Sequence, residues 1–187
     1  MTSAPDIRAL GPALRRWRAL NRVKQTTVAT ELGVSQTTIS RWENLEQVPE
    51  PRDVRRLMRL IAATPTASSD LALIELVSTA ATPMHLVCDL THRLIAASPR
   101  RLASWRVGVG ELVGTSLWRF ASQGIRAGEE ALASRGWYEP VAPDVTVETE
   151  RVSFPELTID AGRIRYSRMP LANGGFARLV RADVCHA

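Results

Sequence analysis

Cysteine is scarce in this chain, and its scarcity excludes a disulfide framework. The 187 residues contain only Cys88 and Cys185, which are too few and too far apart in sequence for several crosslinks. No group of cysteines and histidines has the spacing of metal ligands. We therefore expect two reduced thiols, no metal and no cofactor, with Cys88 as a small core residue.

Long apolar runs are also missing. No run of apolar residues approaches the roughly 18 that a membrane-spanning helix needs. The N-terminus lacks the basic segment followed by an apolar one that marks a secretory signal. We expect a cytoplasmic protein with no membrane partner.

The surplus of positive charge is confined to one part of the chain. Residues 1–64 contain 11 lysines and arginines against 6 acidic residues, whereas residues 65–187 contain 13 of each. Neutralisation of phosphates by basic side chains supplies most non-specific affinity for nucleic acid. A run of arginines can also simply solvate a helix face, so the charge alone is weak evidence.

The length and one polar segment indicate two domains. A chain of 187 residues suffices for two small domains, and residues 64–69 read Thr-Pro-Thr-Ala-Ser-Ser, which is typical of a linker. We expect a first domain over residues 1–64, a linker over 65–69 and a second domain over 70–187.

Residues 25–44 have the pattern of two short helices joined by a glycine turn. Apolar residues fall on one helical stripe before Gly33 and continue after it, at Val28, Ala29, Leu32, Val34, Ile39 and Trp42. The second helix is left with an outward face of hydrogen-bonding side chains, at Gln36, Thr37, Ser40 and Arg41. Such side chains suit base edges and phosphates in the major groove of DNA.

The segment from about Ile7 to Ile61 resembles the Cro/C1-type, XRE-like helix-turn-helix family. Gln25, Ala29, Gly33, Ser35, Ile39 and the closing Trp42-Glu43-Asn44 signature carry the resemblance. It implies that a recognition helix over Ser35–Trp42 enters the major groove of a palindromic operator. The DNA-binding residues it implies are Gln25, Ser35, Gln36, Thr37, Thr38, Ser40, Arg41 and Asn44, with Gln25 on a phosphate.

The same resemblance implies an ion pair between Arg18 in the first helix and Glu43 in the signature. The chain departs from the family after that signature, where Leu45 stands in place of the usual glycine. Leucine is strained at positive φ. We therefore expect either that Asn44 takes the left-handed conformation or that the helix runs on by part of a turn.

The second half of the chain predicts strands and short helices in a definite order. Helices are expected over 71–80, 98–105 and 125–134, a loop over 108–117, and strands over 84–89, 93–97, 145–154, 163–169 and 176–184. Asn173-Gly174-Gly175 predicts a hairpin between the last two strands. Two strands, short helices and three antiparallel strands form the order of a PAS domain.

Three segments carry the resemblance to PAS domains in detail: Val87-Cys88-Asp89, the stretch from His92 to Pro99, and the stretch from Glu111 to Leu117. The fold class expected is thus an all-α helix-turn-helix bundle followed by an α+β, PAS-like domain with an antiparallel sheet. PAS domains dimerise or sense a small molecule, haem, flavin or light, and a fold alone does not choose among these roles.

No ligand is assigned to this domain from its residues. The helix predicted over 125–134 has no histidine for haem, and the Asn-Cys-Arg context of light-sensing relatives is missing. His85, His92 and His186 are interpreted as surface or hydrogen-bonded histidines. Three tryptophans can either line a ligand cavity or fill the core: Trp105, Trp118 and Trp137.

An enzymatic role is not expected. Ser167-Arg168-Met169-Pro170 is similar to the serine motif of the self-cleaving peptidases found in many phage-type repressors, but that mechanism needs a lysine base after the serine. Lys24 is the only lysine in the chain. No other pair of nucleophile and base stands out.

The helix over 71–80 is more apolar than the edge of one small domain requires. We expect it to form a homodimer through Leu71, Leu73, Ile74, Leu76 and Val77, although it can also simply pack on its own sheet. The partners predicted are therefore double-stranded DNA and a second copy of the chain. Two alternatives stay open: the second domain docks a regulatory protein or RNA polymerase, or it senses a small molecule.

Overall fold

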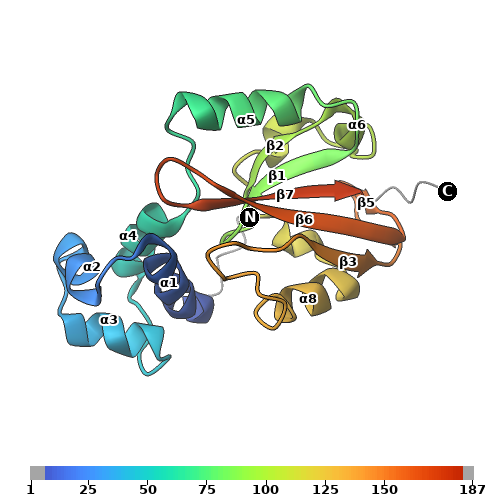
Figure 1. Ribbon diagram of the computed structural model, residues 1–187. Helices are drawn as coiled ribbons and strands as arrows, with labels where there is room; N and C mark the ends of the chain where they lie inside the picture. The colour runs from blue at the N-terminus through green and yellow to red at the C-terminus, as the bar shows by residue number, and fades with distance from the viewer. Residues whose placement is uncertain (1–6, 183–187) are drawn as a thin grey trace. The chain divides into compact units, whose positions relative to one another are not determined.

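The computed structural model describes residues 7–182 and shows two compact units that divide between Ala62 and Ala63 (Figure 1). The segment expected to be a linker, residues 65–69, belongs to the second unit. There the carboxylate of Asp70 accepts hydrogen bonds from the backbone N–H groups of Thr66 and Ala67, which fixes the start of the following helix.

The first unit is a four-helix bundle. Its helices are α1 (Ile7–Asn21), α2 (Gln25–Leu32), α3 (Gln36–Glu43) and α4 (Pro51–Ile61). Five side chains from all four helices are almost fully buried: Leu14, Val28, Ile39, Trp42 and Leu57. These are the stripes that the apolar spacing predicts, so the all-α bundle is confirmed.

The turn between α2 and α3 has the local chemistry that the sequence specifies. Gly33 has a φ of 65°, a conformation in which a side chain would be strained, and it ends α2. Ser35 then caps α3, because its hydroxyl accepts a hydrogen bond from the backbone N–H of Thr38.

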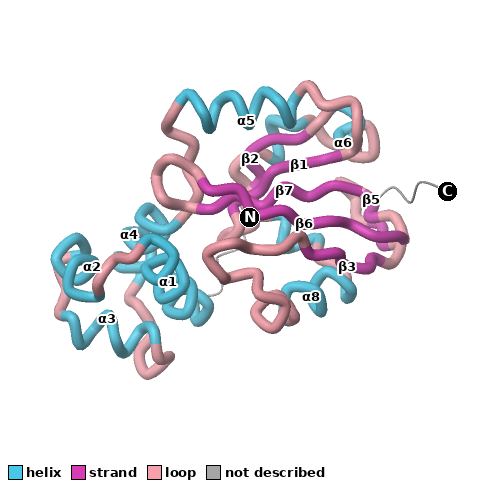
Figure 2. Tube along the Cα trace, viewed as in Figure 1, coloured by secondary structure: helices cyan, strands magenta, loops and turns pink. Residues whose placement is uncertain are grey.

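The second unit contains one five-stranded antiparallel sheet (Figure 2). Its strands are β1 (Met84–Cys88), β2 (Leu94–Ala97), β3 (Val145–Thr149), β6 (Gly162–Pro170) and β7 (Phe176–Ala182). They lie in the order β2-β1-β7-β6-β3, so β1 and β7, the first and last strands of the unit, pair with each other. A separate ribbon joins β4 (Val152–Ser153) to β5 (Thr158–Ile159).

The helical elements of this unit are short except for the first. They are α5 (Ser68–Ser78), α6 (Pro99–Leu102), α7 (Val109–Leu112), the 3₁₀ helix η1 (Leu117–Phe120) and α8 (Gln123–Glu130). Strands, short helices and strands thus follow one another as in a PAS domain. The predicted α+β fold with an antiparallel sheet is confirmed.

The two faces of the sheet have different neighbours. Val87, Tyr166 and Val180 belong to the main core, together with residues of α7, η1 and α8's connection to β3. Side chains alternate along a strand, so Leu86, Cys88 and Leu179 point to the opposite face. Helix α5 packs against β1 and β2.

The strand predicted over 145–154 is wrong in one respect. The period-two pattern runs through Glu150, but the structure ends β3 at Thr149 and places Val152 and Ser153 in the separate ribbon. The reason is long-range: the Glu150 carboxylate accepts hydrogen bonds from the backbone N–H groups of Gln123 and Gly124 at the start of α8. It caps that helix, which begins two residues earlier than predicted and ends at Glu130.

Of the two cysteines, the structure describes Cys88. Cys88 is free and buried, and its Sγ accepts a hydrogen bond from the Ala63 N–H at 3.3 Å. Cys185 and His186 lie outside the described residues. Between residues 7 and 182, no helix is long and apolar enough to cross a membrane.

Candidate nucleic-acid interface

Helix α3 has one buried face and one polar face. Ile39, Trp42 and Glu43 are buried in the bundle. The opposite face consists of hydrogen-bonding side chains, with Gln36, Thr37, Arg41 and Asn44 exposed and Thr38 and Ser40 half-buried. Residues 37, 41 and 44 follow one another at the i, i+4, i+7 spacing of a single helical stripe. The residues predicted for base recognition therefore share one accessible surface.

An ion pair fixes the end of α3 against α1. Arg18 Nε donates to Glu43 Oε1 at 2.7 Å, and Arg18 Nη2 donates to Glu43 Oε2 at 2.8 Å. The Glu43 side chain is 2% exposed and that of Arg18 is 17% exposed. The hydrogen bond with Glu43 is the main cause of a raised pKa at Arg18. Such a two-point contact holds both side chains in one geometry.

Gln25 continues this chain of contacts to the exposed face. Its Nε2 donates to Glu43 Oε2 at 2.9 Å, and its Oε1 accepts from Gln36 Nε2 at 2.7 Å. The structure therefore connects the ion pair, the first residue of α2 and the first residue of α3, a link that the sequence did not reveal. Gln25 thus fixes the position of the Gln36 side chain, and Gln25 is itself fixed by its hydrogen bond to Glu43.

The hydroxyl groups of Ser35 and Thr38 are hydrogen-bonded to each other. The Ser35 hydroxyl caps α3, and it also shares a hydrogen bond with Thr38 Oγ1 at 2.8 Å. Both side chains thus stabilise the start of the helix, whatever they contact outside it.

The residue after the Trp-Glu-Asn signature corrects the sequence prediction. Asn44 has a φ of −93° and is not left-handed, and α3 ends at Glu43. Leu45 itself takes the left-handed conformation, with a φ of 63°. The bundle thus tolerates a strained leucine at the position where the resembling family has glycine, and Leu45 extends into solvent.

Close packing of α1 on α3 depends on a glycine that the sequence analysis did not single out. A Cβ atom placed on Gly11 would lie 1.8 Å from the carbonyl oxygen of Trp42. The two helices approach so closely because this position has no side chain. Glycine inside an otherwise helical pattern was the available signal.

The five residues expected to dimerise do not share one exposed surface. Val77 is buried against the sheet, and Leu73 and Ile74 are half-buried. Leu71 and Leu76 are 60% and 69% exposed. Packing of α5 on its own sheet therefore uses part of the apolar set, and two leucines remain available.

A buried polar cluster in the second unit was also not predicted. Arg178 on β7 is 3% exposed, and its guanidinium binds Asp89 and Glu129. Arg178 Nε lies 2.7 Å from Asp89 Oδ1, and Arg178 Nη1 lies 2.5 Å from Glu129 Oε2. Trp137 Nε1 also donates to the Asp89 carboxylate.

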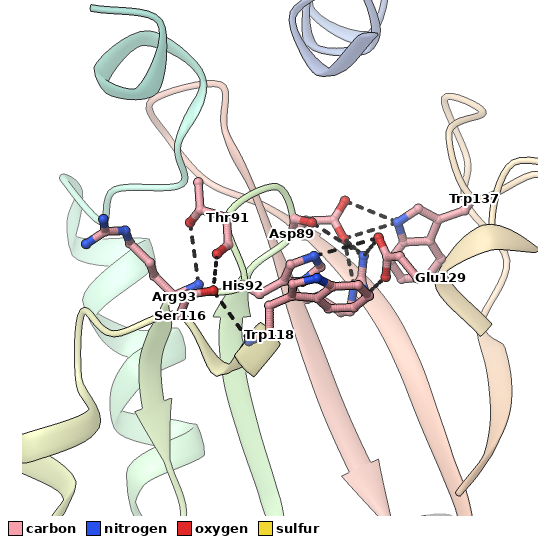
Figure 3. A network of polar contacts seen from close by, with 9 residues as sticks. Asp89, Thr91, His92, Arg93, Ser116, Trp118, Glu129 and Trp137 are labelled. Atoms are coloured by element: carbon pink, nitrogen blue, oxygen red, sulfur yellow. Dashed lines mark hydrogen bonds and ion pairs between the residues drawn. The ribbon is translucent and has the colours of Figure 1, made fainter. Parts of the chain in front are cut away.

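The charge of Arg178 is stabilised by the two carboxylates. Burial lowers the pKa of Arg178, but the two carboxylates outweigh it and the pKa is raised overall. His92 Nε2 lies 3.9 Å from Glu129 Oε1, and the His92 ring stacks on the ring of Trp118 (Figure 3). Burial, followed by the charge of Arg178, lowers the pKa of His92. These contacts tie α8 and the η1 segment to the centre of the sheet.

Comparisons with known proteins support the assignment of the first unit. A family model described as a helix-turn-helix domain matches residues 9–71. None of the curated proteins matches the chain. Among solved structures, one that is similar is described as an RNA-binding Light-Oxygen-Voltage receptor, with 12% identity and a TM-score of 0.42. That comparison covers 93% of this chain and 58% of the receptor chain, so the chain spans less than two thirds of it. The match covers about a third of this chain, and its last residues, 63–71, lie in the second unit.

Proposed function

We propose that this protein is a transcriptional regulator that binds specific DNA through α3. The observation that carries the proposal is the exposed stripe of Gln36, Thr37 and Arg41 on the second helix of a helix-turn-helix domain. Arginine and glutamine are the side chains that most often form paired hydrogen bonds with guanine and adenine. We also propose that the helix-turn-helix is of the Cro/C1 type and that the protein binds DNA without catalysing a reaction.

The charge distribution supports DNA as the partner. The positive surplus of the chain lies in residues 1–64, the part that contains the helix-turn-helix domain. Phosphate contacts position a protein on the duplex, and base contacts give it specificity. We expect affinity to fall steeply as the salt concentration rises.

The test begins with selection of bound sequences from a random duplex library by the full chain. Fluorescence anisotropy at one salt concentration then compares the selected duplex with random DNA. Arg41→Ala and Gln36→Ala should weaken binding to the selected duplex about 5- to 150-fold and change binding to random DNA little. Gln25→Ala should lower both, because its proposed contact is a phosphate.

A matched control removes an arginine from another helix of the same unit. Arg59→Ala in α4 takes away one exposed charge and should leave the preference for the selected duplex unchanged. Equal losses on both duplexes for Arg41→Ala would show that Arg41 contacts phosphate and not a base. Failure of the full chain to enrich any sequence would refute the proposal.

Dimerisation is the second part of the proposal. One helix-turn-helix reads few base pairs, so a specific regulator usually places two of them on half-sites about 10–10.5 bp apart. Leu71 and Leu76 on α5 offer apolar surface that the sheet does not cover. We assign that surface to a second copy of the chain, which would give a palindromic operator.

Light scattering of the full chain at micromolar concentration tests this part. The chain should be a dimer, and Leu76→Glu should make it a monomer that binds the selected palindrome more weakly. Val141→Glu alters another exposed apolar residue of the second unit, outside α5, and should leave the dimer intact. A monomeric wild-type chain would instead favour a protein partner, such as another regulator or RNA polymerase, for the second unit.

A further inference from the structure

The second unit contains a cavity of about 300 Å³ that is partly open to solvent. Residues of β1, β6 and β7 form one side of it, and residues of α6, η1 and the loop before β6 form the others. At about 30 Å³ for each water in the liquid, this volume corresponds to about ten water molecules. It lies at the lower end of the volumes of small-molecule sites. The cavity can therefore hold a compact organic molecule.

Most of the cavity wall is apolar and aromatic. Trp105, Trp118 and Phe120 contribute rings, and aliphatic side chains such as Leu117, Ile125 and Leu157 fill the spaces between them. Large flat side chains around a small volume suit a planar apolar body. This lining favours an aromatic or similarly flat ligand.

Two of the residues that line the cavity each have one buried nitrogen atom with no hydrogen-bond partner among the described residues: His85 Nδ1 and Arg101 Nε. His85 lies on β1, and its ring makes an edge contact with Trp105, with 6.0 Å between the ring centroids. Arg101 lies on α6, and one of its terminal nitrogens reaches the Pro83 carbonyl oxygen only at 3.5 Å. Buried polar groups are nearly always paired in folded proteins, so these two need an explanation.

Among the described residues that line the cavity, the one carboxylate forms no ion pair with Arg101. That carboxylate belongs to Asp160, and its Oδ1 lies 3.5 Å from Arg151 Nη1. Arg178 also borders the cavity, but Asp89 and Glu129 balance it.

The state of the two unpaired groups can be assigned from their surroundings. Burial first, and the charge of Arg101 second, lower the pKa of His85 well below its usual value, so His85 is neutral at pH 7. Burial lowers the pKa of Arg101, and Asp160 raises it in part. An arginine side chain stays protonated in proteins, so Arg101 is a cation in the cavity wall.

We propose that this cavity binds a small aromatic carboxylate, with the carboxylate on Arg101 and His85 and the ring between Trp105 and Trp118. Arginine binds carboxylates through two parallel hydrogen bonds, and a neutral histidine can donate a third. A carboxylate would give Arg101 the ion-pair partner that no described lining residue provides. The site lies in the second unit and does not rest on the proposed DNA binding.

Isothermal titration calorimetry of the full chain tests the proposal with three probes: benzoate, phenylacetate and indole-3-acetate. Each is compared with its neutral amide, which has nearly the same shape. We expect saturable binding of at least one carboxylate to one site per chain, with a dissociation constant below about 1 mM. Its amide should bind at least about tenfold more weakly, because it lacks the charge-assisted hydrogen bonds.

Variants then locate the site. Arg101→Gln should weaken carboxylate binding about 10- to 100-fold, whereas Arg101→Lys should retain part of it because the charge remains. Arg135→Gln removes an exposed arginine outside the cavity and should leave the affinity unchanged. Circular dichroism checks that each variant is folded.

A second variant keeps the test valid if Arg101→Gln does not fold. Ala121 lines the cavity, and Ala121→Leu should reduce carboxylate binding by filling the space. Three results would overturn the proposal: no saturable binding of any of the three carboxylates, equal affinity for the amides, or wild-type affinity in the folded Arg101 or Ala121 variants.

Discussion

Glu43 should be essential for the stability of the first unit. Glu43→Ala removes the acceptor of three hydrogen bonds and leaves the guanidinium of Arg18, which is largely buried, without its counter-charge. Removing one partner of a buried pair costs about 3–5 kcal/mol. A domain of about 60 residues has a total stability of roughly 3–9 kcal/mol, at 0.05–0.15 kcal/mol per residue. The substitution should therefore consume most of the stability of this unit.

Amide hydrogen exchange of the full chain measures the effect. Protection of the amides in α1 and α3 should fall by about two to four powers of ten, since 1.4 kcal/mol corresponds to a factor of ten. Amides of the five-stranded sheet should change little and provide an internal reference. Protection in α1 and α3 that stays within threefold of wild type would refute the argument.

Two further variants separate the charge from the packing. Glu46→Ala removes an exposed acid from the next loop and should leave protection unchanged. The double variant Arg18→Met with Glu43→Leu removes both charges and should be more stable than Glu43→Ala alone, because neither charge is left unpaired. A double variant as unstable as the single one would mean that shape, and not charge, holds α1 and α3 together.

Three further predictions have definite expected outcomes. Leu45→Gly removes the strain of a leucine at positive φ but raises the conformational entropy of the unfolded chain. We expect it to stabilise the first unit by up to about 1 kcal/mol in chemical denaturation. Gly11→Ala should destabilise it by about 1–3 kcal/mol, because the new methyl group meets the backbone of α3, whereas Gly110→Ala, which has no neighbouring atom within 4 Å, should be neutral. Burial lowers the pKa of His85 and of His92, so below about pH 6.5 the unfolded chain binds more protons than the folded one. The melting temperature of the second unit should therefore fall from pH 7 to pH 5. The fall should be smaller in His85→Phe, which has one such histidine fewer.

The helix-turn-helix could be predicted because its determinants are local. The apolar spacing of Val28, Ile39 and Trp42, the glycine turn and the Ser35 cap each act within a few residues, and the structure reproduces all of them. The bridge from Glu43 through Gln25 to Gln36 could not be predicted in this way. It depends on how the ends of α2 and α3 meet in space, and a glutamine carries no charge to indicate its partner.

The strand that was predicted too long shows the same limit. Residues 145–154 alternate correctly for a strand, and period two alone gives no reason to stop at Glu150. The strand stops because the Glu150 carboxylate caps a helix that begins 27 residues earlier in the chain. An interaction of that range outweighs the local pattern, and nothing within the segment announces it.

The position of Arg178 in the sequence indicates that this arginine is buried. It occupies the same face of β7 as Val180, so the alternation of that strand places an arginine in the core. An arginine at such a position requires buried carboxylates, and the structure supplies Asp89 and Glu129. The sequence offers several acids for this role and does not say which ones the fold brings there.

The cavity is the feature on which sequence patterns are least informative, because they report which face of an element is apolar and not which face borders empty space. His85 was interpreted as a surface or hydrogen-bonded histidine, yet the packing of α6 on β1 places it with Arg101 in one cavity wall, and its Nδ1 has no partner. Two adjacent groups that can each carry a positive charge disfavour one another, which is one reason why the pKa of His85 is lowered. The fold keeps them together with no carboxylate bound to Arg101 among the described residues. We therefore expect an anion from solution to complete this site, which is the physical basis for choosing carboxylates, and not their neutral amides, as ligands.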